Sequence, residues 1–150
     1  MRSGRGPVDP LREFLRLWER LRSDSAEEGT VVVVEGDRDQ ASLRRIGLPG
    51  PIVKVHRGRA LSDTARHLVG GSRRVIVLTD WDVEGGHLAR RLREFLEAER
   101  LHLDLDYRRR IARIVRGELV HVEGLYGWAR RLAERDGASL EDLLGAGGAV

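Results

Sequence analysis

Hydrophobic residues follow two different spacings along this chain. At positions 11, 14, 15, 18 and 21 they recur at helical intervals, and Pro10 stands where the first turn of a helix accepts proline. Residues 30–34 form instead an unbroken run of Thr and Val, which is typical of a strand buried on both faces. The sequence therefore predicts an N-terminal helix over 11–21 and a central strand over 30–34.

Short apolar runs and helical patterns then alternate up to residue 105. We predict strands over 52–55, 74–78 and 101–105, and helices over 40–46, 63–69 and 86–100. Such an alternation predicts an α/β fold with three layers: a Rossmann-like sheet of about four mostly parallel strands, with helices on both faces. Right-handed crossovers place the ends of its strands at one edge, where ligands bind in such folds.

Helical patterns flank this region on both sides. Residues 107–115 are dense in arginine, 122–135 have apolar residues at helical spacing, and Ser139 can begin a short last helix. We therefore expect three parts: an N-terminal helical extension (1–28), the α/β domain (29–107) and an arginine-rich helical extension (108–150).

Composition narrows the function classes. The chain lacks cysteine, which excludes disulfides, thiolate metal sites and thiol catalysis. No apolar run approaches the length of a membrane span, and the start lacks the apolar core of a signal peptide, so we expect a cytoplasmic protein with no membrane partner. Lys54 is the only lysine, and the pI is about 10.1 although the net charge is only +3. Arginine suits phosphate binding, but arginines paired with glutamate on solvated helix faces would give the same composition.

Carboxylates stand where two of the predicted strands end. Glu35 follows the run 30–34, and Asp80 and Asp82 follow the run 74–78. Side chains two residues apart on extended backbone point the same way, so both aspartates can reach one ion. Oxygen ligands of this kind suit Mg²⁺, and two ions could clamp the attacking and leaving oxygens of a phosphoryl transfer. The alternative is that the aspartates only cap the helix that follows.

Two segments carry a resemblance to a known family. The Val-Glu-Gly segment at 34–36 and the Leu-Thr-Asp-Trp-Asp-Val-Glu-Gly-Gly segment at 78–86 resemble a Toprim domain, which primases, topoisomerases and some nucleases share. The chain is similar in particular to small stand-alone archaeal Toprim proteins, over roughly residues 31–132. The resemblance implies a Toprim fold and catalytic Mg²⁺, in two ions with Mn²⁺ as a substitute, held by Glu35, Asp80 and Asp82. It also implies that the glutamate acts as general base in making strands and as general acid in breaking them.

Cationic residues give candidates for phosphate contacts. Lys54, Arg57 and Arg59 follow the second predicted strand, so we expect them at the same edge as the acids. Arg109 and Arg113 share a helix face that could follow a nucleic-acid backbone or could simply be solvated. The histidines show no shared spacing for a metal; His87 is the best placed to contact phosphate, although a surface role is favoured. The histidines considered are His56, His67, His87 and His121.

Together these features predict a Mg²⁺-dependent protein that acts on DNA or RNA, in the simplest case a nuclease that cleaves phosphodiester bonds. The alternative is a non-catalytic nucleic-acid-binding module that assists recombination or repair and has a structural metal site. The Asp-x-Asp motif also resembles the first motif of haloacid-dehalogenase-type phosphatases, in which Asp80 would be the nucleophile and Asp82 the general acid. That family needs a lysine further along the chain, and none follows Lys54.

Overall fold

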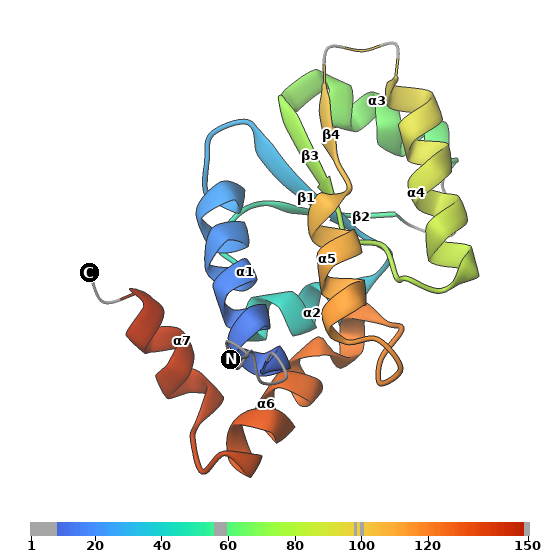
Figure 1. The fold of residues 1–150 in the computed structure, drawn as a ribbon. Helices are drawn as coiled ribbons and strands as arrows, with labels where there is room; N and C mark the ends of the chain where they lie inside the picture. Colours follow the sequence, from blue (N-terminus) through green and yellow to red (C-terminus); the bar gives the residue numbers. More distant parts are fainter. Residues whose placement is uncertain (1–8, 56–59, 98, 100, 149–150) are drawn as a thin grey trace, which may run out of the picture.

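The computed structural model describes residues 9–55, 60–97, 99 and 101–148 and shows a four-stranded sheet between two layers of helices (Figure 1). The strands stand in the order β2-β1-β3-β4, and every neighbouring pair is parallel, as the alternating pattern predicts. They are β1 (Thr30–Val34), β2 (Ile52–Lys54), β3 (Arg74–Val77) and β4 (His102–Asp104). The prediction of a mostly parallel α/β sheet is therefore confirmed.

The two central strands are hydrophobic on both faces because both faces are covered. In β1, Val31 and Val33 face one helical layer, whereas Val32 and Val34 face the other. The register pairs Val31 with Val75 in β3, so valines of the two strands form continuous buried rows. Burial on both sides explains why this run lacks the alternation of a half-exposed strand.

Helices α3 and α4 cover one face of the sheet, and the remaining helices gather on the other (Figure 1). The first layer is α3 (Leu61–Gly71) and α4 (Val83–Leu96). The second is α1 (Pro10–Ser25), α2 (Asp37–Arg45), α5 (Asp106–Ile114), the 3₁₀ helix η1 (Val122–Gly124) and α6 (Leu125–Arg135), with α7 (Leu140–Gly148) packed against α6.

Aromatic rings tie the first and last helices to the second layer. Phe14 of α1 stacks on Trp18 with ring centroids 5.5 Å apart, and it meets Trp128 of α6 edge to face at 5.4 Å. The indole N–H of Trp18 donates to the carbonyl of Ile46 (2.9 Å), which satisfies the polar end of a buried ring. The N-terminal and C-terminal helices thus share one hydrophobic core with this face of the sheet.

Helix boundaries differ from the prediction where capping decides them. Helix α2 begins at Asp37 rather than at residue 40, because Gly36 takes the cap position. Asp39 lies inside the first turn, and its Oδ2 accepts the Gly36 N–H (3.0 Å). Among the described residues, no helix is long and apolar enough to cross a membrane.

Candidate metal centre

The three predicted acids lie together at the carboxyl edge of the sheet. Glu35 leaves β1 and Asp80 follows β3, and these two strands are neighbours. The backbone N–H of Asp80 donates to Oε2 of Glu35 (2.8 Å), which joins the two strand ends directly. The parallel topology therefore brings together acids that are far apart in the sequence.

The two aspartates are each held by one oxygen and present the other. Oδ1 of Asp80 accepts the backbone N–H of Val122 (2.8 Å), and Oδ1 of Asp82 accepts that of Gly85 (2.7 Å). The second bond is the N-cap of α4, so Asp82 does cap the helix, and it does so with only one oxygen. The Oδ2 atoms of both residues stay available for another partner.

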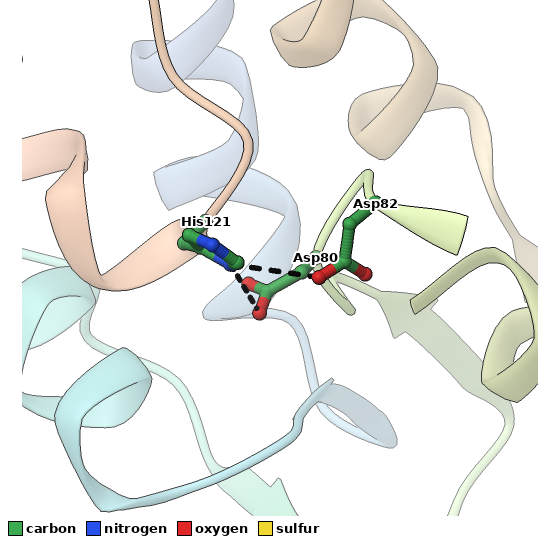
Figure 2. Close-up of side chains that lie close together, drawn as sticks. All are labelled: Asp80, Asp82 and His121. Atoms are coloured by element: carbon green, nitrogen blue, oxygen red, sulfur yellow. Dashed lines mark hydrogen bonds and ion pairs between the residues drawn. The ribbon is translucent and has the colours of Figure 1, made fainter. Parts of the chain in front are cut away.

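That partner is His121, which sequence reasoning did not place in the site. Figure 2 shows its ring directed at both carboxylates, with Nδ1 3.1 Å from Oδ2 of Asp80 and 3.7 Å from Oδ2 of Asp82. One donor atom from each of the three residues falls in a group within 4.8 Å, a spacing that could hold a metal ion. Histidine spacing gave no signal because His121 lies far along the chain from both aspartates.

Trp81 fixes the segment that carries His121. Its backbone N–H donates to the carbonyl of Val120 (3.1 Å) and its indole N–H to the carbonyl of Leu119 (2.5 Å). The indole is also partly buried against the second-layer core. At the start of the segment, Glu118 accepts the indole N–H of Trp128 (2.7 Å). These bonds hold the chain before His121, and the bond from the Val122 N–H to Asp80 holds it after.

The turn between β3 and α4 requires a glycine. A Cβ on Gly85 would lie 1.8 Å from the carbonyl oxygen of Asp80, closer than any real contact. The hydroxyl of Thr79, which is fully buried, donates to the carbonyl of Gly85 (2.8 Å) across the same turn. A side chain at residue 85 would push the turn open and displace both aspartates.

Arg108 supports the same turn from behind. Its Nε donates to the carbonyl of Thr79 (3.0 Å) and its Nη2 to that of Asp80 (2.6 Å). Burial lowers the pKa of this guanidinium, while Glu35 and the two aspartates oppose that shift. The arginine-rich run 107–115 therefore contains one residue that is committed to the turn rather than to solvent.

Negative charge accumulates around the centre. Burial raises the pKa of Glu35 to about 7; the Asp80 N–H opposes the rise, and the carboxylates of Asp80 and Asp82 add to it. Burial and the Asp80 carboxylate also raise the pKa of Asp39. The hydrogen bond to Asp80 raises the pKa of His121. The neighbouring carboxylates contribute to all three shifts, and burial is the larger cause for Glu35 and Asp39.

The acids line a cavity of about 620 Å³. Among its described lining residues, six are carboxylates and two are arginines, Arg38 and Arg91. A phosphate would be repelled from such a cavity unless cations neutralised it. Oxygen donors in this number are what Mg²⁺ and Mn²⁺ bind, so the residues fit a divalent ion. The six are Glu35, Asp39, Asp80, Asp82, Glu84 and Glu123.

Of the residues predicted to contact phosphate, Arg57 and Arg59 lie outside the described part of the chain. Lys54 ends β2 at the same edge as the acids, in register with Val34, and forms an ion pair with Asp37 (2.5 Å). Arg109 borders a hollow beside β4, and Arg113 lies in a groove between α1 and α5. His87 is exposed on α4, beside the cavity rather than lining it.

Comparisons with known proteins agree with this geometry. A family model described as "Toprim domain" matches residues 30–114. A "UPF0292 protein" of Thermococcus gammatolerans is 33% identical over 134 residues, which cover 89% of this chain and 96% of that protein. One from Pyrococcus horikoshii is 34% identical over 128 residues, which cover 85% of each chain. One from Methanosarcina acetivorans is 31% identical over 119 residues, 79% of this chain and 82% of the relative.

A solved structure has the same fold. A "putative protein from Aquifex aeolicus" superimposes with a TM-score of 0.59 at 21% identity, covering 78% of this chain and 98% of that one. The sheet order, the acids at its carboxyl edge and these likenesses point the same way. The chain belongs to the Toprim domain family.

Proposed function

We propose that the protein is a divalent-metal-dependent enzyme that cleaves phosphodiester bonds in DNA or RNA. The observation that carries the proposal is the convergence of Glu35, Asp80, Asp82 and His121 on one cavity whose acids outnumber its cations. The Toprim domain is associated with metal-dependent chemistry on nucleic acid, which makes a phosphodiester the natural substrate class.

Asp80 and Asp82 would hold Mg²⁺ or Mn²⁺, in two ions when substrate is bound, through the oxygens that the backbone leaves free. The metal would supply charge stabilisation and an activated water. Glu35 stands next to Asp80 and is the group of this chain to which we assign proton transfer. Arg38 and Arg91 line the same cavity and would orient the phosphate.

Cleavage assays test the proposal directly. Labelled single-stranded and double-stranded DNA and RNA should be incubated with the protein and Mg²⁺ or Mn²⁺. We expect cleavage of at least one substrate, and Asp80→Asn or Asp82→Asn should slow it by at least about 100-fold. Asp63→Asn, on an exposed residue of α3, is the matched control and should leave the rate unchanged. Absence of cleavage in a protein shown to bind metal would overturn the proposal.

A second candidate is a module that binds nucleic acid without cutting it. The groove between α1 and α5 favours it, because its described lining includes four arginines and one glutamate around about 390 Å³, and none of these five also lines the acidic cavity. Such a groove could hold a phosphate backbone independently of the metal. The arginines are Arg16, Arg20, Arg110 and Arg113.

Binding assays separate the two candidates. Arg113→Ala should weaken binding of single-stranded and double-stranded probes alike and flatten its dependence on salt, measured by fluorescence anisotropy. Arg130→Ala, on an exposed residue of α6 near Glu134, is the control. Binding that needs these arginines, without cleavage under any metal, would favour the binding module.

A further inference from the structure

We propose that His121 is a ligand of the metal and that it makes the centre bind Mn²⁺ more tightly than Mg²⁺. This inference rests on the proposed metal site and specifies its selectivity. His121 lies beyond residue 114, where the Toprim match ends, so the ligand comes from the C-terminal part of this chain rather than from the matched domain.

The distances fit coordination of one ion. Two donors at about 2.1 Å from an ion lie about 3.0 Å apart when they subtend a right angle and about 4.2 Å apart when they are opposite. Nδ1 of His121 lies 3.1 Å from Oδ2 of Asp80 and 3.7 Å from Oδ2 of Asp82, within that interval in both cases. The ring and the two carboxylates face a common point (Figure 2).

Backbone hydrogen bonds determine which oxygen of each aspartate faces His121. Both Oδ1 atoms accept backbone N–H groups, from Val122 to Asp80 and from Gly85 to Asp82. The Oδ2 atoms are therefore the ones presented to His121, and their orientation does not depend on the ion. Such outer hydrogen bonds are what holds carboxylate ligands in place at metal sites in general.

The histidine is anchored as well. Trp81 donates hydrogen bonds to the carbonyls of Leu119 and Val120, the two residues immediately before His121. Val122, immediately after it, donates to Asp80. The backbone on both sides of His121 is therefore fixed, and its ring is held facing the two aspartates.

The choice of metal follows from the donor set. Mg²⁺ prefers oxygen ligands and keeps several of its waters, whereas an imidazole nitrogen suits first-row transition ions better. Replacing one oxygen by Nδ1 of His121 therefore favours Mn²⁺ over Mg²⁺. Without His121, the remaining carboxylates should discriminate less between the two ions.

Calorimetric titration with MnCl₂ and MgCl₂ measures the effect. We expect Mn²⁺ to bind the unmodified protein roughly tenfold or more tightly than Mg²⁺, and His121→Ala to remove most of that difference by weakening Mn²⁺ binding. His67→Ala, on an exposed residue of α3, is the matched control and should change neither affinity. His121→Asp, which restores an oxygen donor, should keep metal binding while lowering the preference for Mn²⁺.

Pulsed electron paramagnetic resonance on the Mn²⁺-loaded protein gives a readout that activity does not. A ¹⁴N coupling from a directly bound imidazole is expected in the unmodified protein and in His67→Ala, and it should vanish in His121→Ala and His121→Asp. Mn²⁺ bound without that coupling in the unmodified protein would overturn this inference and leave the proposed metal site standing. Failure to bind any divalent ion would overturn both.

Discussion

Strand β3 begins and ends in charged surroundings that are built in opposite ways. At its start, Arg74 donates to Asp104 (2.6 Å) and Asp24 (3.2 Å), and the hydroxyl of Tyr107 also donates to Asp24. At its end, Asp80 joins a group of carboxylates, and the guanidinium of Arg108 beside them donates to the backbone carbonyls of Thr79 and Asp80 instead. One end carries an arginine paired with its acids, whereas at the other end no arginine or lysine of the described residues forms an ion pair with Asp80 or Asp82.

The comparison distinguishes acids that stabilise the fold from acids that are placed to bind a cation. Each acid near Arg74 has a donor from the chain itself, so these carboxylates need no external cation when the protein folds. Burial and Asp24 hold the pKa of Tyr107 above its ordinary value, which keeps its hydroxyl a donor. Around Asp80, burial raises the pKa of Glu35 and the carboxylates of Asp80 and Asp82 add to the rise, and an external cation would offset the repulsion between these acids. Stability should therefore depend on residues at the first end and on metal at the second.

The largest effect should come from removing the cation at the first end. Arg74→Met leaves Asp104, which is buried, without its ion pair, and should lower the free energy of unfolding by about 3 kcal/mol in urea denaturation. Metal affinity should stay unchanged, because the centre lies at the other end of the strand. A loss below about 1 kcal/mol would show that this network is not structural.

Metal should act at the second end alone. Mn²⁺ at 100 times its Kd should raise the free energy of unfolding by about 2.7 kcal/mol, which for a chain of this size corresponds to about 5–10 °C in Tm. Arg74→Met should keep this increment, measured by differential scanning calorimetry, and Asp80→Asn should lose it. An increment that survives in Asp80→Asn would place the ion elsewhere.

Adjacent glycines test the turn that presents the aspartates. Gly85→Ala should cost about 2 kcal/mol of stability and weaken metal binding, because the new methyl group collides with the Asp80 carbonyl. A Cβ on Gly86 would meet only Nη2 of Arg108 at 3.8 Å, so Gly86→Ala should be neutral or should stabilise α4 by about 0.5–1 kcal/mol. Equal effects of the two substitutions, in urea unfolding and metal titration, would contradict this account.

The smallest effect should be a gain. Without metal, Asp80→Asn removes a charge beside Glu35 while keeping an oxygen for the Val122 N–H, so it should leave stability unchanged or raise it by about 0.5–1 kcal/mol. Chemical denaturation in a metal chelator measures it. A clear loss of stability would mean that Asp80, like Asp104, serves the fold.

The sequence predicted what depends on periodicity and topology. The run at 30–34 became β1 with the same bounds, and the alternating elements became a parallel sheet. Because parallel strands end at one edge of a sheet, the topology alone predicts that Glu35 and Asp80 lie close together, and the structure joins them by a hydrogen bond.

What depends on long-range packing stayed hidden. His121 reaches the aspartates through hydrogen bonds between Trp81 and a segment with no periodic pattern. Arg108 looked like one of several solvated arginines, and only its burial against the turn distinguishes it from Arg109 and Arg110. Neither contact follows from local spacing, so neither could be predicted from the residues that carry it.

The indole of Trp81 has a thermodynamic consequence for the centre. Bringing residue 121 next to residue 82 closes a loop of about 40 residues, which for a free chain costs about 3 kcal/mol of conformational entropy. The bonds from Trp81 to Leu119 and Val120, together with the packing of α6, close that loop during folding. An arriving ion then meets ligands whose ordering is already complete. A residue that contacts no metal would therefore set a large share of the affinity for it.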